Sequence, residues 1–265
     1  MQIEETWSEG TAYEAYVGRW SREVARRFVA WLDVAQGRRW LDVGCGTGAL
    51  SEAILEAAEP SAVVGVDQSR AYVDAARSRM KDPRTSFLTA RAEDLPAALG
   101  VFDAVVSGLV LNFVPQAGRT LGGLVRVVRP GGVVAAYVWD YAGEMQLMRH
   151  FWDAAVELFP DTGALDEGVR FAAFGRDGVA TLFAGAALVE VEATGIVVPT
   201  RFRDFDDYWR PFEGGQGPAP SFAMALDDAD RVRLRERIRS RLPIESDGSI
   251  ELVARAWAVR GRRAA

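Results

Sequence analysis

Short apolar runs alternate with stretches of helical periodicity through the first half of the chain. The runs predict strands at 39–43, 62–66, 85–88, 102–106 and 133–138. Between them, apolar residues three or four positions apart predict helices at 13–35, 49–58, 70–80 and 115–128. Continuous apolar strands that alternate with helices are typical of a parallel sheet covered on both faces. The pattern therefore predicts a doubly wound α/β fold.

The alternation breaks down after Trp139. We expect helices at 144–159, 176–184 and 227–241, strands at 187–193 and 250–259, and irregular structure elsewhere in 200–248. The stretches 141–175 and 196–248 are interpreted as lid insertions on the substrate side, because loops on a rigid scaffold often determine specificity. The predicted organisation is one domain, 1–265, with a helical cap at 1–36 and a core of 37–140, 176–195 and 249–262.

A glycine-rich segment, Gly44-Cys45-Gly46-Thr47-Gly48, follows the first predicted strand and opens a helix. Glycines allow a sharp turn and the close approach of a ligand, and a helix N-terminus attracts anionic groups. Asp67 ends the second predicted strand, where a carboxylate can accept hydrogen bonds from both hydroxyls of a ribose. The spacing of Gly44, Gly46 and Ala49 also fits the dinucleotide fingerprint. The loop alone leaves an adenosyl ligand and a dinucleotide as alternatives.

The composition excludes several kinds of chemistry. One cysteine (Cys45) and one histidine (His150) in 265 residues exclude a disulfide framework and a Cys/His zinc site and leave only an all-carboxylate site for a hard cation. No metal ligand is predicted. Lys81 is the only residue that could form a Schiff base.

The charge balance bears on partners and location. The net charge is −6 and the isoelectric point is about 5.1, which argues against nucleic acid and anionic membranes as partners. The N-terminus, Met1 to Glu5, is acidic and does not resemble a signal peptide. No apolar run approaches the ~18 residues of a membrane helix. We expect a cytoplasmic protein.

Five motifs, in order across residues 41–138, resemble those of class I S-adenosylmethionine-dependent methyltransferases. They are Leu41-Asp42-Val43-Gly44-Cys45-Gly46-Thr47-Gly48, Gly65-Val66-Asp67-Gln68-Ser69, Arg91-Ala92-Glu93-Asp94-Leu95-Pro96, Phe102-Asp103-Ala104-Val105-Val106-Ser107 and Arg129-Pro130-Gly131-Gly132. Small-molecule methyltransferases of ubiquinone and menaquinone biosynthesis are particularly similar. The resemblance implies a Rossmann-like sheet, mostly parallel with an antiparallel last strand, and S-adenosylmethionine as the cofactor.

The resemblance also implies roles for individual residues. Gly44 and Gly46 would pass under the methionine part of the cofactor, Asp67 would hold the ribose, and Gln68 would pack near the adenine. Backbone groups of Ala92 and Glu93 would meet the adenine edge, and the carbonyl of Ser107 would meet the methionine ammonium. Family members often have an acidic residue where this chain has Arg91. The other predicted cofactor-binding residues are Asp42, Cys45, Tyr16 and Arg19, of which Arg19 suits the cofactor carboxylate.

Methyl transfer from a sulfonium needs alignment and exclusion of water more than a base. Relatives often have histidines where this chain has Leu111-Asn112-Phe113, so the candidate catalytic base is His150, with Asp140, Tyr141 and Glu144 nearby in sequence. The aromatic residues Trp152, Tyr208, Trp209 and Phe212 fit a pocket wall and a small core equally well.

The sequence thus predicts methyl transfer from S-adenosylmethionine to a small-molecule acceptor. The site after the fourth strand reads Ser107-Gly108-Leu109-Val110 and lacks the Asn/Asp-Pro-Pro-aromatic motif of base-modifying enzymes. Two alternatives stay open: an inactive partner protein that binds S-adenosylmethionine, and a nicotinamide-dependent dehydrogenase.

Overall fold

A computed structural model describes residues 18–214 and 217–265. The chain divides into two compact units. The first, here the sheet unit, comprises residues 21–138, 174–196 and 256–265. The second, here the aromatic unit, comprises 139–173 and 197–255 together with the N-terminal residues through Trp20. Each unit is described by itself, and the predicted single domain stays a prediction.

The sheet has seven strands in the order β3-β2-β1-β4-β5-β7-β6. β1 (Arg39–Val43) pairs in parallel with β2 (Ala62–Asp67) and β4 (Phe102–Gly108). β3 (Thr85–Thr89) pairs in parallel with β2, and β5 (Val128–Trp139) with β4. The last strand, β7 (Ile250–Arg263), is antiparallel and lies between β5 and β6 (Leu188–Phe202). This arrangement confirms the predicted Rossmann-like fold.

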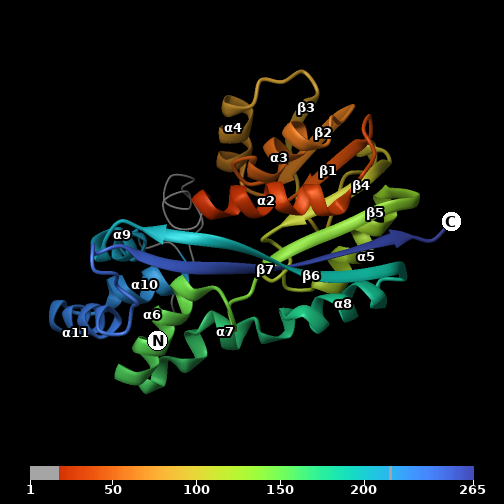
Figure 1. Cartoon of the computed structure of the whole chain (residues 1–265). Helices are drawn as coiled ribbons and strands as arrows, with labels where there is room; N and C mark the ends of the chain where they lie inside the picture. Colours follow the sequence, from red (N-terminus) through yellow and green to blue (C-terminus); the bar gives the residue numbers. More distant parts are fainter. Residues whose placement is uncertain (1–17, 215–216) are drawn as a thin grey trace. The chain divides into compact units, whose positions relative to one another are not determined.

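Side chains of the parallel strands alternate between two apolar layers. Leu41 and Val43 belong to a core cluster that contains residues of α5 (Ala117–Val127) and α8 (Arg176–Gly185). Asp42, between them, points to the other face and accepts a hydrogen bond from Ser51 of α3 (Ala49–Ala57). Because successive strand residues face opposite sides, both faces of β1 are buried. Helices α3 and α4 (Arg70–Arg79) cover one face, and α5 and α8 cover the other (Figure 1).

The fifth strand begins earlier than its sequence predicts. Phe102 pairs with Val128 and Ala104 with Val133, so the segment between Val128 and Val133 is an irregularity within the β4–β5 ladder. A β-carbon on Gly132 would lie 2.6 Å from Val128 Cγ2 and 2.8 Å from the Asp103 carbonyl oxygen. The backbone of this segment therefore packs too tightly for a side chain at Gly132, and glycine is required there.

The sixth strand is also longer than the predicted 187–193. The alternation continues through Ile196, Val198, Thr200 and Phe202, which are buried, while Val197, Pro199 and Arg201 between them are exposed. Pro199 lies within this run. Because β6 is the last strand in the sheet order, a residue without a backbone N–H is tolerated there.

The aromatic unit contains most of the remaining helices. They are α6 (Gln146–Leu158), η3 (Pro160–Leu165), α7 (Glu167–Arg170), α9 (Phe205–Trp209), η5 (Arg210–Glu213), α10 (Pro218–Ala225) and α11 (Asp228–Arg239). The sheet unit adds η2 (Ala97–Leu99) and α2 (Arg19–Leu32) from Ser21 onward, and η4 (Ala172–Phe174) lies at the junction of the two ranges. The expectation of irregular structure in 200–248 is wrong for 205–213 and 218–225, where packing rather than periodicity fixes short helices, and is confirmed for 240–248.

Buried aromatic rings form the core of the aromatic unit. Phe151 stacks on Phe212 with ring centroids 4.5 Å apart, and Trp152 lies 5.9 Å from Phe222. The Tyr208 ring is fully buried and its hydroxyl donates to the Leu147 carbonyl at 2.8 Å. These aromatic side chains are packed against one another, so they stabilise the unit's own core.

Candidate functional site

The glycine-rich loop is fixed to the end of β2 by its backbone. The amides of Gly44 and Cys45 both donate to the Val66 carbonyl, at 2.7 and 3.0 Å. Gly44, Gly46 and Gly48 all have positive φ, of 76°, 53° and 93°. A side chain in this left-handed region is strained, which explains the three glycines.

Asp67 joins the loop to the next helix. Its Oδ2 accepts from the Gly46 amide at 2.9 Å, and its Oδ1 accepts from the Ser69 amide at 2.8 Å. The Ser69 hydroxyl in turn accepts from the Tyr72 amide and caps α4. Burial raises the pKa of Asp67, and the two amide hydrogen bonds oppose that rise. A carboxylate oxygen can accept more than one hydrogen bond, so Asp67 can still bind a ligand's hydroxyls.

Space around the loop differs from one glycine to the next. A β-carbon on Gly44 would lie 2.4 Å from Val110 Cγ2, so Val110 packs directly on this residue. A β-carbon on Gly46 would meet no described atom within 4 Å. The open side of the loop is therefore at Gly46, beside Asp67. Beyond it, Gly48 precedes α3 and gives that helix no side-chain cap.

Asp42 is fully buried behind the loop. The Ser51 hydroxyl donates to its Oδ2 at 2.7 Å, and its Oδ1 has no hydrogen-bond partner among the described residues. Desolvation and the nearby Asp67 raise the pKa of Asp42 to about 7, against the bond from Ser51. A carboxyl in this position is partly neutral near pH 7.

Cys45 is a packing residue in this structure. It is 6% exposed and clusters with Val73, Ala76 and Phe87. Burial raises the pKa of its thiol far above the ordinary value, and the carboxyls of Asp42 and Asp67 add to the rise. The thiolate form is disfavoured, so Cys45 is no nucleophile.

Ser107 and the loop after β4 adjoin the same sheet edge. The Ser107 hydroxyl donates to the Val43 carbonyl at 2.8 Å, which ties the end of β4 to the end of β1. Leu109 has a φ of 61° and donates its amide to the Tyr137 carbonyl. Asn112 is 7% exposed, and neither atom of its amide has a partner among the described residues. This loop thus holds a buried polar group beyond Val110.

The other predicted adenine-side residues follow β2 and β3. Gln68 is exposed, and Ala92 packs against the core cluster of α5 and α8. Glu93 is half-buried and forms an ion pair with Arg91 at 3.6 Å. The guanidinium of Arg91 thus pairs with Glu93.

Two predicted residues fall outside what the structure describes. Tyr16 precedes the described residues, and the side chain of Arg19 is also outside them. His150 belongs to the aromatic unit, on α6. The pKa of His150 is lowered, mainly because the imidazole is buried. The negative charge of Asp153 opposes this shift and the positive charge of Arg241 adds to it. His150 therefore lies beside charged side chains of its own unit, Asp153 on α6 and Arg241 beyond the end of α11.

The candidates near His150 in sequence have structural partners. Asp140 Oδ2 accepts from Arg255 Nη2 at 2.6 Å and from the Glu144 amide at 2.9 Å. The Tyr141 ring is buried and lies 5.4 Å from Phe171. Asp140 is engaged in holding the chain after β5 to β7, which favours a structural role.

Three residues near the loop were not predicted from the sequence. Val110 contacts Gly44, Ser51 binds Asp42, and Tyr72 has a buried hydroxyl with no partner among the described residues. Ser51 could have been found, because it follows Asp42 at the first turn of the predicted helix. The contact of Val110 with Gly44 and the burial of the Tyr72 hydroxyl depend on tertiary packing.

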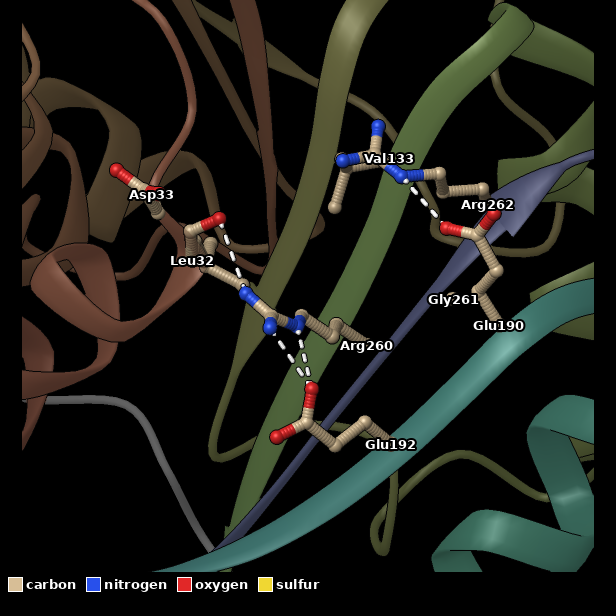
Figure 2. A pocket seen from close by; sticks show the side chains of 8 residues that line it. All are labelled: Leu32, Asp33, Val133, Glu190, Glu192, Arg260, Gly261 and Arg262. Carbon is tan, nitrogen blue, oxygen red and sulfur yellow. Dashed lines mark hydrogen bonds and ion pairs between the residues drawn. The ribbon is translucent and has the colours of Figure 1, made fainter.

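A separate surface hollow lies in the sheet unit, lined by Leu32, Asp33, Val133, Glu190, Glu192, Arg260, Gly261 and Arg262 (Figure 2). Asp33 precedes β1, so the hollow is at the amino-terminal edge of the parallel strands and not at the glycine loop. Arg260 pairs with Glu192 at 2.7 Å, and Arg262 pairs with Glu190 at 3.1 Å. Arg260 also donates to the Leu32 carbonyl at 3.2 Å. These contacts indicate a structural clamp on the end of α2.

Within the described residues, no helix is long and apolar enough to cross a membrane. The same part of the chain has no group of three or more His, Cys, Asp or Glu residues that could hold a metal ion.

Comparison with known proteins gives one family model, the methyltransferase domain, which matches residues 41–136. A demethylmenaquinone methyltransferase of Symbiobacterium thermophilum is 36% identical over 122 residues, 43% of this chain and 47% of the relative. A second, from Geobacillus sp. strain WCH70, is 29% identical over 66% of this chain and 79% of the relative. A phthiotriol/phenolphthiotriol dimycocerosates methyltransferase of Mycobacterium leprae is 33% identical over 37% of each chain. The chain thus spans about half or less of the length of two of these relatives.

Solved structures show the same fold at low sequence identity. The YcgJ protein of Bacillus subtilis has a TM-score of 0.60 and 15% identity, covering 92% of this chain and 99% of that one. Phosphoethanolamine N-methyltransferase 2 of Haemonchus contortus, in complex with S-adenosyl-L-methionine, has a TM-score of 0.57 and 16% identity over 97% of this chain and 57% of that one. Sheet order, glycine loop and family model agree. Residues 41–136 therefore match a methyltransferase domain, and the comparisons together support the class I S-adenosylmethionine-dependent type.

Proposed function

We propose that this protein transfers the methyl group of S-adenosylmethionine to a small-molecule acceptor. When bound, the cofactor would supply a methyl group on a sulfonium sulfur: the acceptor atom would bond to the methyl carbon as the carbon–sulfur bond breaks, S-adenosylhomocysteine would leave, and a hydroxyl, amine or carbon acid would lose a proton. The protein's part is to align the two partners and exclude water.

The observation that carries the proposal is the pairing of Gly46 with Asp67. The Gly46 amide is held 2.9 Å from Asp67 Oδ2, and the space over its α-carbon is open. A flat loop beside a half-buried carboxylate fits an adenosyl group, with the ribose hydroxyls donating to Asp67. The uncapped start of α3 after Gly48 suits the methionine carboxylate.

The remaining cofactor contacts complete the proposal. Arg19 pairs with the cofactor carboxylate and Tyr16 lines the pocket. Gln68, Ala92 and Glu93 surround the adenine, and the carbonyl of Ser107 accepts from the methionine ammonium. Asp42 and Cys45 support the loop from beneath.

The acceptor is proposed to be a small molecule with a polar group beside its reacting atom. Relatives include demethylmenaquinone methyltransferases and a ubiquinone biosynthesis O-methyltransferase. The loop after β4 offers Asn112, whose amide can both donate and accept and has no partner among the described residues. A hydroxyl or carbonyl of an acceptor would satisfy it. Nucleic acid is not the proposed acceptor, and a cytoplasmic location stays a prediction.

His150 stays the proposed general base. Its lowered pKa favours the neutral imidazole that a base requires. If His150 acts so, His150→Gln lowers kcat about 100-fold or more and removes the acidic limb of the pH–rate profile. A variant with unchanged kcat and pH profile would remove His150 from the mechanism.

Calorimetric binding tests the cofactor site. Wild-type protein should bind S-adenosylmethionine, and Asp67→Ala should weaken binding at least about tenfold, because two charge-assisted hydrogen bonds are lost. Asp82→Ala is the matched control, since Asp82 is an aspartate of the sheet unit that pairs with Arg84. Absence of binding to folded wild-type protein would refute the proposal.

Turnover separates the proposal from its alternatives. Release of S-adenosylhomocysteine with any member of a panel of quinols, phenols and amines excludes an inactive partner protein. The dehydrogenase alternative is disfavoured by the antiparallel β7 between β5 and β6, because the usual dinucleotide-binding sheet has the order 3-2-1-4-5-6. A thermal shift with NADH but not with S-adenosylmethionine would revive it.

A further inference from the structure

Val110 presents apolar surface at the glycine-rich loop. Its side chain lies against Gly44, where a β-carbon would come 2.4 Å from Val110 Cγ2 and 3.0 Å from Val110 Cγ1. Val110 is half-buried rather than fully buried. A ligand that lies along the loop can therefore reach this valine and cover the surface that the free protein leaves exposed.

The turn before Val110 is strained and is held in place by β5. Leu109 has a φ of 61°, a left-handed geometry that leucine rarely adopts. Its amide donates to the Tyr137 carbonyl at 2.8 Å, and a β-carbon on Gly108 would lie 2.6 Å from the Tyr137 hydroxyl oxygen. Strain of this kind persists where surrounding contacts enforce it, and it clusters at ligand sites. The enforced turn directs Val110 onto Gly44.

The position of Val110 corresponds to one end of the proposed ligand. The space over Gly46, beside Asp67, is open and is where the adenosyl group is proposed to lie. Val110 covers Gly44 instead, and it follows Ser107, whose carbonyl is proposed to accept from the methionine ammonium, by three positions. The amino-acid chain of the cofactor consists of methylene carbons between its sulfur and its charged end. An apolar side chain beside these carbons gains free energy when the ligand covers it.

We propose that Val110 packs against the methylene carbons in the amino-acid part of the cofactor and keeps water from the adjoining sulfur. The inference rests on the proposed function, since it needs an adenosyl ligand on the glycine-rich loop. It makes Val110 a specificity-determining residue, which favours ligands that carry the amino-acid chain over adenosine derivatives that lack it.

Titration calorimetry with two ligands tests the inference without any acceptor. S-adenosylhomocysteine carries the amino-acid chain, whereas 5′-methylthioadenosine keeps the adenosine and the sulfur but lacks that chain. In Val110→Ala, two methyl groups are lost, so affinity for S-adenosylhomocysteine should fall about three- to tenfold, while that for 5′-methylthioadenosine should change less than about twofold. Val110→Thr keeps the volume but places a hydroxyl among the methylenes, so it should also weaken S-adenosylhomocysteine.

Val101→Ala is the matched control. Val101 immediately precedes β4, at the opposite end of that strand from Val110, and is 56% exposed. The same substitution there should leave both affinities at their wild-type values. An equal loss for the two ligands in Val110→Ala would overturn the inference, because Val110 would then shape the loop as a whole. Wild-type affinity for S-adenosylhomocysteine in Val110→Thr would overturn it too, because volume alone would then account for the valine.

Leu109→Gly tests the turn that positions Val110. Glycine adopts the left-handed geometry without strain, so the melting temperature of the ligand-free protein should stay the same or rise. Affinity for S-adenosylhomocysteine should fall less than in Val110→Ala; a larger loss would assign the contact to the leucine side chain and overturn the proposal. If wild-type protein binds S-adenosylhomocysteine and Val110→Ala binds it equally well, only the Val110 inference fails. If folded wild-type protein does not bind, the proposed function fails first.

Discussion

Replacing Asp42 by asparagine tests whether the carboxyl behind the glycine loop is neutral in the folded protein. The wild-type side chain is fully buried, with one oxygen bonded to Ser51 and the other without a partner among the described residues. Asparagine keeps the shape and an oxygen that can accept from Ser51, but it cannot ionise. The difference between the two proteins therefore isolates the titration of one carboxyl.

The size and sign of the effect follow from the pKa. The ordinary value of 3.8 rises to about 7 in the fold, and each tenfold change in proton affinity is worth about 1.4 kcal/mol, so the raised pKa contributes about 4 kcal/mol at low pH. The folded state binds more protons than the unfolded state between these values. The contribution is therefore complete below pH 3.8 and is lost as the pH rises through about 7.

Urea unfolding of wild type and D42N from pH 5 to pH 8 measures this contribution. We expect wild type to lose about 2–3 kcal/mol of unfolding free energy relative to D42N across that range. Other titrating groups, such as His150, cancel in the comparison. S51A is the companion variant: removing the hydroxyl that stabilises the charged form should raise the pKa of Asp42 further and shift the loss to higher pH.

A constant difference between wild type and D42N from pH 5 to pH 8 would refute the reasoning. It would mean that Asp42 is ionised throughout, and that a cation or water compensates the buried charge.

Three further predictions concern residues of the sheet unit. Gly44→Ala should destabilise the fold by about 1–3 kcal/mol, since φ is 76° and the new β-carbon meets Val110; Val110→Ala should recover part of that loss in urea unfolding. For Asp103→Asn, the difference in unfolding free energy from wild type should change with pH in the opposite direction to that for D42N. The Arg39 amide and the nearby arginines lower the pKa of Asp103 against its desolvation. The stabilisation by Asp103 is therefore present above pH 3.8 and vanishes on acidification. The Cys45 thiol should react with Ellman's reagent only after unfolding, and rapid reaction in buffer would contradict its burial.

The alternation of strands and helices could be predicted because it is local. β1, the glycine loop and α3 are adjacent in sequence, so apolar runs and glycine spacing were enough to predict them. The helices between Phe202 and Ala225 could not be predicted in this way. α10 begins Pro218-Ala219-Pro220, and its position depends on Phe222 packing against α6.

The same distinction explains which site residues were missed. Val110 covers Gly44 because Leu109 has left-handed backbone geometry, which no feature of Leu109 itself predicts. His150 illustrates the converse. The sequence singles it out as the lone histidine, but its neighbour Arg241 is 91 positions away, and only the fold shows that the turn after α11 supplies charge beside it.

Burial decides between the two readings of the aromatic residues. Trp152, Tyr208 and Phe212 are almost completely inaccessible and contact other rings, so exposing one of them to an acceptor would open the core of their unit at a cost of several kcal/mol. They therefore cannot line a pocket while the unit keeps this packing.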